Sequence, residues 1–233
     1  MVQIVRKFSV LLFVSLTAGI ACAQNVESPK SPCNAERWAE TIAKFAAADE
    51  IEPPPQGGIL FVGSSSIRMW KLPKYFPDLP VINRGFGGSE ICDSVHYFDT
   101  LVAKHLPRVV VLYAGDNDVA GGKSAAQVLS DFQSFVKLMK EKLPQARLVY
   151  ISIKPSLARW KLAEEMKDSN QRIAADCEPD KRRLRFVDVW QPMLGSDQKP
   201  RQELFLKDGL HLNHEGYQLW TGLLQQHLHS HDQ

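Results

Sequence analysis

The 233-residue sequence has little net charge, because 28 lysine and arginine residues nearly balance 26 aspartate and glutamate residues. The formal net charge at neutral pH is +2. Proteins that bind nucleic acid carry a basic patch or stripe, often with aromatic side chains between the cations. The sequence has no such stripe, so we expect no nucleic-acid partner. An apolar fraction of 44% and a charged fraction of 23% are instead typical of a globular domain.

The sequence also lacks an apolar run long enough to cross a membrane. The stretch over residues 8–20 spans 13 positions, whereas a membrane-spanning helix needs about 20. A basic region precedes this stretch and the small-residue site "ACA" follows it, which is the pattern of a secretory signal peptide. We therefore expect residues 1–23 to be cleaved before Gln24 and the protein to be exported, to the periplasm or beyond, with no stable membrane insertion afterwards.

An alternative at this end of the chain is a lipid attached to Cys22, although Gly19 stands where such a site prefers leucine. Residues 24–33 are polar and contain proline, and we interpret them as a leader. The remaining residues, 34–233, have no linker, internal repeat or low-complexity segment, and their number suits one domain. Nothing in the sequence indicates an oligomeric state.

Cysteine is scarce, and after removal of the signal peptide only Cys33, Cys92 and Cys177 remain. Disulfides form in the compartments to which exported proteins go. An odd number of thiols permits at most one internal pair, and the sequence leaves open which two residues form it. None of the three belongs to a Cys-x-x-Cys motif, so we expect neither metal nor redox chemistry through cysteine, and no cofactor.

Short apolar runs alternate with helical patterns along the domain. The runs "GILFVG", "PVINRG", "PRVVVLYAG", "ARLVYISI" and "LRFVDV" predict strands buried on both faces. Patterns of helical period predict helices over residues 34–50, 90–104, 124–143, 158–177 and 214–229. This alternation predicts right-handed crossovers and an α/β fold: a three-layer α/β/α sandwich around a parallel sheet of about five strands.

In such a sheet, ligands bind outside the carboxyl ends of the strands. The loops expected at that edge are "GSSS", "NRGFGGSE", "AGDND", "IKPS" and, before the last helix, "LKDGLHLN". These loops hold most of the polar side chains that could act on a substrate. We therefore looked there for the parts of an acyl-transfer site: a nucleophile, a base, a group that orients the base and donors to an oxyanion.

The nucleophile candidates are Ser64, Ser65 and Ser66. A serine between a strand and a helix exposes its hydroxyl near the free N–H groups and positive dipole end of the helix. The alternative is a capped turn, in which one serine caps the helix and the others fill the loop. The triplet by itself does not distinguish these interpretations.

The base candidate is His211, three residues after Asp208. At this spacing the carboxylate can hold Nδ1 of the imidazole and leave Nε2 free to accept a proton. An ordinary Asp-Gly turn is the alternative. Asn117 could donate its side-chain amide to an oxyanion, with Asp116 or Asp118 bracing the loop, although an Asx-turn explains the same residues.

The glycines of "GFGGSE" permit close backbone approach, so the N–H of Gly88 is a further oxyanion donor. The loop does not fit a dinucleotide-binding Gly-x-Gly-x-x-Gly motif, because Glu90 stands at the third glycine position. A nucleotide cofactor is therefore not indicated.

These loops, in this order, resemble the SGNH/GDSL hydrolase family, from "FVGSSS" to "DGLHLNHEGY". The resemblance covers nearly the whole chain after the signal peptide. It implies a flavodoxin-like α/β/α fold and the activity of an esterase, lipase, thioesterase or related acylhydrolase that uses no metal or organic cofactor.

An ungapped alignment with the family's Gly-Asp-Ser block assigns the nucleophile to Ser65. Ser64 then stands at the family's usual aspartate position. The same resemblance implies that Asp208 and His211 complete the catalytic triad. It also implies an oxyanion hole formed by Ser65, Gly88 and Asn117.

The sequence thus predicts an exported serine esterase whose substrate is a small-molecule, lipid or glycan ester. Acetyl groups on polysaccharides suit an exported enzyme, while lysophospholipids and thioesters remain open. A non-catalytic glycan-binding protein on the same scaffold is a rival interpretation. Side chains near the strand ends that could shape the pocket, or simply pack, are Trp70, Arg84, Lys154 and Trp160.

A third interpretation is a metal-dependent hydrolase built on histidines. It would use His211, His214 and the tail residues His227, His229 and His231. The tail pattern "HLHSH" fits a solvated C-terminus better, and a metal site needs convergent ligands supported by surrounding groups. We therefore expect no metal.

Overall fold

A computed structural model of the chain describes Met1 and residues 33–229. The expected signal peptide, nearly all of the polar leader and His231 lie outside the described residues. Within the described part of the chain, no helix combines the length and apolar character that crossing a membrane requires.

The centre of the fold is a five-stranded, all-parallel sheet with the strand order β2-β1-β3-β4-β5. Each strand lies within one of the five apolar runs of the sequence. The strands are β1 (Ile59–Gly63), β2 (Val81–Gly85), β3 (Val109–Tyr113), β4 (Arg147–Ile151) and β5 (Leu184–Val187). The strand order is that of flavodoxin-like folds. The predicted fold class is therefore confirmed.

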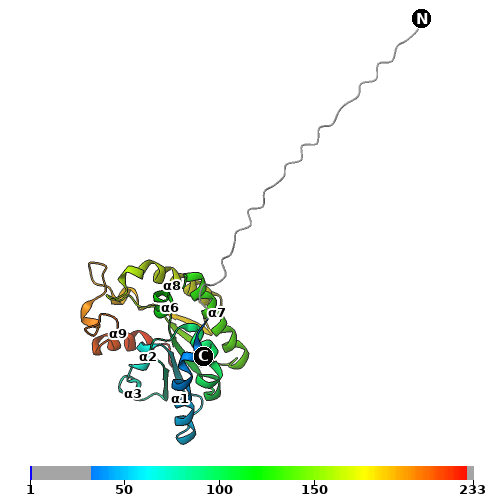
Figure 1. Ribbon diagram of the computed structural model, residues 1–233, viewed down its shortest axis with the longest axis vertical. Helices are drawn as coiled ribbons and strands as arrows, with labels where there is room; N and C mark the ends of the chain where they lie inside the picture. The colour runs from blue at the N-terminus through cyan, green and yellow to red at the C-terminus, as the bar shows by residue number, and fades with distance from the viewer. Residues whose placement is uncertain (2–32, 230–233) are drawn as a thin grey trace.

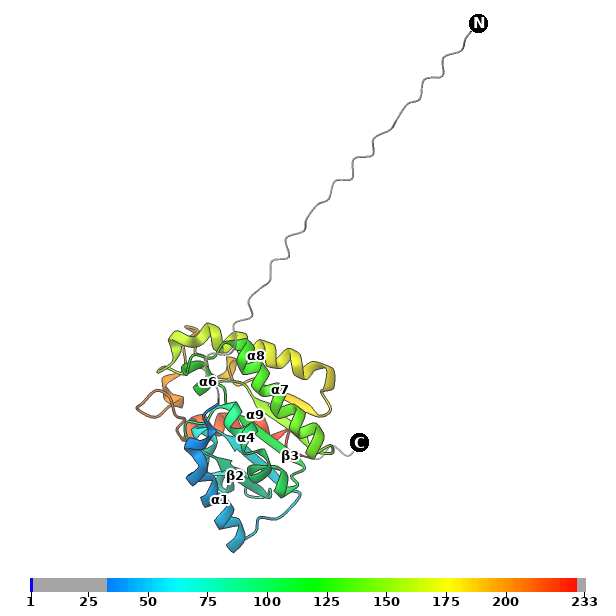
Figure 2. The ribbon, with the colours of Figure 1, turned by 45° about the vertical axis from the view of Figure 1, so that its right-hand side comes forward.

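Helices cover both faces of the sheet (Figures 1 and 2). They are α1 (Ala39–Ile51), α2 (Ser65–Arg68), α3 (Leu72–Tyr75), α4 (Ile91–His96), α5 (Phe98–Leu101), α6 (Asp116–Ala120), α7 (Ala125–Lys142), α8 (Ala163–Cys177) and α9 (His214–Gln225). Short 3-10 turns are η1 (Ala35–Trp38), η2 (Ala103–His105), η3 (Trp160–Leu162), η4 (Glu178–Asp180), η5 (Gln191–Met193) and η6 (Gln202–Leu204).

Alternate side chains of each strand point into two separate cores, as strand geometry requires. Leu60 and Val62 of β1 pack with α1, α4, α5, α7 and α8 on one face. Ile59 and Phe61 pack on the other face with α2, α3 and α9, where Trp220 is fully buried. Both faces of the sheet are thus covered, which explains why the central strands β1 and β3 are continuous apolar runs in the sequence.

The expected helix over residues 90–104 is divided into α4, α5 and η2. Tyr97, between α4 and α5, has φ −97° and ψ 20°, and its hydroxyl donates a hydrogen bond to the carbonyl of Ala35 at 3.2 Å. The break between α4 and α5, which the local pattern did not predict, thus coincides with a contact between Tyr97 and the distant Ala35. The helix expected from residue 158 likewise begins later, with α8 at Ala163, because residues 158–159 form a turn and the 3-10 turn η3 follows them.

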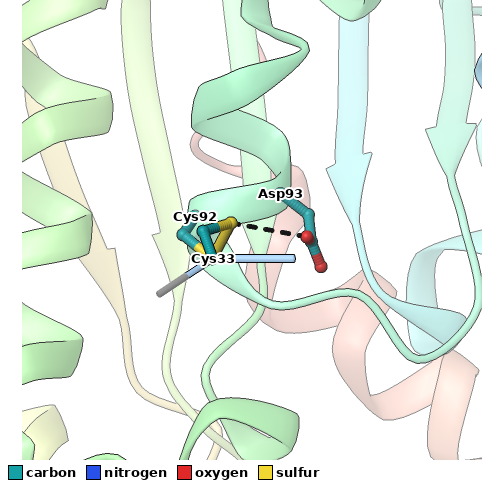
Figure 3. A group of neighbouring side chains, drawn as sticks. All are labelled: Cys33, Cys92 and Asp93. Carbon is teal, nitrogen blue, oxygen red and sulfur yellow. Dashed lines mark hydrogen bonds between the residues drawn. A yellow bond between two sulfur atoms is a disulfide. The ribbon is translucent and has the colours of Figure 1, made fainter. Parts of the chain in front are cut away.

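A disulfide joins Cys33 to Cys92 (Figure 3), and Cys177 is a free, buried thiol. The bond attaches the start of the described domain to the first turn of α4. The carboxylate of Asp93 lies 3.5 Å from the Cys33 sulfur, and these three residues are the one group in the described chain with metal-ligand spacing. Because both sulfurs are used in the disulfide, this group is a covalent link rather than a metal centre.

Candidate active site

The "GSSS" turn presents one of its three hydroxyls to the edge of the sheet. Gly63 ends β1 with φ 131°, and a side chain there would collide with the Tyr113 carbonyl, whose oxygen would lie 1.9 Å from the added Cβ. The chain then turns, with Ser64 in an extended conformation and Ser65 as the first residue of α2. Ser64 and Ser66 are each 1% exposed, whereas Ser65 is partly exposed.

Ser65 faces the imidazole of His211, which comes from the loop before α9. Ser65 Oγ lies 3.0 Å from His211 Nε2, and His211 Nδ1 lies 2.6 Å from Asp208 Oδ2. The other oxygen of Asp208 accepts the backbone N–H groups of Leu210 and His211, each at 2.9 Å. The structure therefore brings the three residues of the expected triad into one hydrogen-bonded chain.

The hydrogen bond with His211 lowers the pKa of Asp208 to about 2. The carboxylate is therefore ionised at neutral pH and can only accept a hydrogen bond, so Nδ1 of His211 carries a proton. A neutral imidazole with a proton on Nδ1 has a free lone pair on Nε2, which faces the Ser65 hydroxyl. This arrangement permits His211 to take the serine proton.

The loop after β2 carries Gly88, which has φ 77°. The ring of Trp38 lies next to Gly88. A Cβ added at Gly88 would be 3.6 Å from that ring. Trp38 is in turn fixed by its indole N–H, which donates to the buried carboxylate of Asp93 at 3.0 Å. The N-terminal segment therefore packs directly against this loop.

Asn117 lies in α6, which follows β3, and reaches the Gly88 loop. Its side-chain amide nitrogen donates to the Ser89 carbonyl at 2.9 Å. Asp118 is fully buried and accepts the N–H of Ile91 at 3.1 Å and the ammonium of Lys123 at 3.0 Å. The expectation that an aspartate of "GDND" braces the loop thus holds for Asp118, which ties α6 to the start of α4.

Asp116 has different partners, and one of them was not among the residues singled out from the sequence. Its carboxylate contacts Lys154 Nζ at 2.9 Å and Arg159 Nη1 at 3.0 Å. Arg159 also donates through Nη2 to Oδ1 of Asn117 at 2.9 Å. In the sequence, Arg159 lies 42 residues beyond Asn117, so the contact between them could not be predicted locally. The one signal was its position five residues after Lys154 of the "IKPS" loop.

Two of the residues proposed to shape the pocket have packing roles. Trp70 is 1% exposed and stacks on Tyr217. Arg84 is buried and forms an ion pair with Asp49. Trp160 is partly exposed and stacks on Trp190, with ring centroids 6.1 Å apart.

Three histidines of the metal-hydrolase interpretation that lie in the described part of the chain, His211, His214 and His229, have separate partners. His211 contacts Ser65 and Asp208, while Nδ1 of His214 lies 2.8 Å from the Tyr75 hydroxyl. His229 accepts a hydrogen bond from Arg147 through its backbone carbonyl. These separate partners disfavour a shared metal site.

Comparison with known proteins shows what this chain is similar to. A family model described as GDSL-like Lipase/Acylhydrolase family matches residues 64–219. The platelet-activating factor acetylhydrolase IB subunit alpha1 of Pongo abelii is 26% identical over 144 residues, which cover 59% of this chain and 58% of that protein. The chain therefore spans less than two thirds of the length of this curated relative.

Solved structures resemble the fold over most of the chain. A GDSL-like lipase from Bacteroides thetaiotaomicron is 26% identical with a TM-score of 0.67, and the match covers 84% of this chain and 97% of the other. A carbohydrate esterase family 3 structure from Talaromyces cellulolyticus is 16% identical with a TM-score of 0.57, covering 73% and 95%. The second likeness concerns the fold alone.

Proposed function

Because the chain belongs to the GDSL-like lipase/acylhydrolase family, a family of ester-bond hydrolases, we propose that it is a serine esterase that uses Ser65, His211 and Asp208. The family match confirms the resemblance drawn from the sequence motifs and the expected class of ester-bond hydrolase. The observation that carries the residue assignment is the continuous chain of hydrogen bonds from Ser65 Oγ through the imidazole to Asp208.

The proposed reaction has two halves. His211 Nε2 takes the proton of Ser65 as Oγ forms a bond to the ester carbonyl carbon, giving a tetrahedral intermediate. The bond to the leaving oxygen then breaks, His211 returns the proton to the departing alcohol, and an acyl-serine remains. Water, deprotonated by His211, attacks this ester and releases the carboxylic acid and the serine hydroxyl. Asp208 keeps the imidazole oriented throughout.

The negative charge of each tetrahedral intermediate needs donors. We assign this role to the backbone N–H groups of Ser65 and Gly88 and to the amide of Asn117. A preorganised donor is effective because it needs no rearrangement when charge develops on the carbonyl oxygen.

An organophosphonate probe tests the nucleophile directly. It forms a covalent adduct with an activated serine, and we expect peptide mass analysis to place that adduct on Ser65. Absence of an adduct on any serine would favour the rival interpretation of a non-catalytic glycan-binding protein. Because no step of the mechanism uses a metal, hydrolysis is expected to continue unchanged in a strong chelator.

For the substrate we propose a carbohydrate O-acetyl ester. A small acyl group is supported by the curated relative, which is named an acetylhydrolase. Lysophospholipids and thioesters are the other candidates. A panel of acetyl esters, long-acyl esters and thioesters separates them: the proposal predicts the highest kcat/KM for acetyl esters, including an acetylated oligosaccharide.

We also propose that the protein is exported. The signal-like pattern at residues 1–23 supports this, as does the disulfide between Cys33 and Cys92, because such bonds persist in oxidising compartments. Cell fractionation, with N-terminal sequencing of the mature chain, tests the proposal: a cytoplasmic, uncleaved protein would contradict it.

A further inference from the structure

The side-chain amide of Asn117 is fixed at both ends. Its Oδ1 accepts a hydrogen bond from Arg159 Nη2 at 2.9 Å, and its Nδ2 donates to the Ser89 carbonyl at 2.9 Å. A guanidinium offers only donors, so the oxygen of the amide must face Arg159 and the nitrogen must face the Gly88 loop. Nδ2 has two hydrogens and the Ser89 carbonyl takes one, so the second remains available to a substrate oxygen.

Arg159 is itself held by a buried negative charge. The carboxylate of Asp116 lies 3.0 Å from Arg159 Nη1 and 2.9 Å from Lys154 Nζ. Asp116 and Lys154 are 4% and 1% exposed. Burial alone would raise the pKa of Asp116, but the two cations lower it below its ordinary value. The carboxylate therefore stays ionised and anchors the guanidinium.

The segment that carries Arg159 also contacts the other half of the site. The backbone N–H of Ala158 donates to the carbonyl of Gly209 at 3.1 Å, and Gly209 lies between Asp208 and His211 in the sequence. One short loop after β4 thus contacts both the segment of the base and the amide of Asn117. The contacts of this loop therefore connect the segment of His211 with the side chain of Asn117.

We propose that Arg159 is a positioning residue, which sets the amide of Asn117 as an oxyanion donor and polarises it. The inference rests on the proposed function, because it requires Asn117 to act on the oxyanion. With Asp116 ionised, the three charges of Asp116, Lys154 and Arg159 leave one net positive charge beside the amide. Both the orientation and this charge favour the transition state over the bound ester, so the loss of Arg159 should lower kcat and leave KM nearly unchanged.

The test is a double-mutant cycle on a short-chain aryl ester, with Arg159→Ala, Asn117→Ala and the double variant. We expect Arg159→Ala to lower kcat by about 10- to 100-fold with KM within about twofold, because a misplaced catalytic group typically costs up to about 10² in rate. In the Asn117→Ala background the same change should have almost no further effect. Arg159→Lys should recover only part of kcat, because one ammonium cannot bridge Asp116 and Asn117 as the guanidinium does. If Arg159→Ala does not fold, Arg159→Lys replaces it in the cycle.

Arg172→Ala is the matched control. Arg172 lies on α8 and pairs with an exposed aspartate, Asp168, at 2.9 Å, so its removal should leave kcat at the wild-type value. An unchanged kcat in Arg159→Ala, or a loss that multiplies with that of Asn117→Ala, would overturn the positioning role. A wild-type kcat in Asn117→Ala alone would instead refute the oxyanion assignment itself, and with it this inference.

Discussion

Oγ of Ser65 lies 3.0 Å from Nε2 of His211, although the two residues are 146 positions apart in the sequence. Both come from loops at the carboxyl edge of the sheet, where parallel strands deliver side chains from distant parts of the chain. Of the three consecutive serines, Ser65 makes this contact, while its two neighbours are buried.

Alanine substitution of Ser65 and of Ser64 gives the first prediction. Ser65→Ala should abolish hydrolysis of an aryl ester, because no hydroxyl remains for His211 to activate, with a loss of about 10⁴ or more in kcat. Ser64→Ala should keep near wild-type kcat and stability, since the buried Ser64 hydroxyl has no hydrogen-bond partner to lose. Initial rates and thermal unfolding of the two variants check this. Full activity in Ser65→Ala would show that the nucleophile is wrongly assigned.

The low pKa of Asp208 gives a prediction for the pH profile. With a pKa of about 2, the carboxylate stays ionised above about pH 3. Between pH 3 and neutrality, kcat/KM should therefore show no inflection from protonation of Asp208. Asp208→Asn should lower kcat by roughly 10³–10⁴, because the amide does not hold the imidazole in the required tautomer.

An inflection in this range that disappears in Asp208→Asn would contradict the role of Asp208 as a permanent anion. Asp168→Asn is a suitable control, since Asp168 lies on the surface of α8 and pairs with Arg172. We expect that variant to reproduce both the rate and the pH profile of the unmodified protein.

His105 makes stability depend on pH away from the active site. Burial, together with the nearby charge of Arg84, lowers the pKa of His105 to about 4. Between about pH 6.5, the ordinary value, and pH 4, the unfolded chain binds a proton that the folded protein does not. The free energy of unfolding should therefore fall as pH decreases, by up to about 1.4 kcal/mol per pH unit from this residue.

Urea unfolding of the wild type and His105→Gln at several pH values isolates this contribution. The difference in unfolding free energy between the two proteins should change across that window and become constant below about pH 4. A difference that is independent of pH would show that His105 is not held neutral in the folded protein.

The disulfide leads to a prediction for stability. It joins residues 59 positions apart, and closure of a loop of this length in the unfolded chain stabilises the fold by about 4 kcal/mol. The double substitution Cys33→Ala with Cys92→Ala should lower Tm by roughly 10 °C. Dithiothreitol should lower the Tm of the wild type similarly and leave that of the double variant unchanged. Equal melting of both proteins without reductant would indicate that the bond does not form.

The sequence predicted the sheet well because the central strands β1 and β3 are buried along their whole length and are therefore continuous apolar runs. It also predicted the contact between Asp208 and His211, which is local. The choice of Ser65 required the family register, because the three serines are equivalent in composition. Arg159 was not predicted, since its partner Asn117 belongs to α6, after another strand, and only the folded path of residues 154–160 brings them together. The pairing of Cys33 with Cys92 stayed open for the same reason.

The disulfide from Cys33 to α4 lies next to the residues that support the Gly88 loop. Asp93, next to Cys92, holds the indole of Trp38, and the ring of Trp38 borders Gly88. A chain kept in a reducing compartment lacks this bond, so its N-terminal segment is held against the loop by non-covalent contacts alone. Reduction of the disulfide is therefore expected to loosen the packing of the N-terminal segment against Gly88.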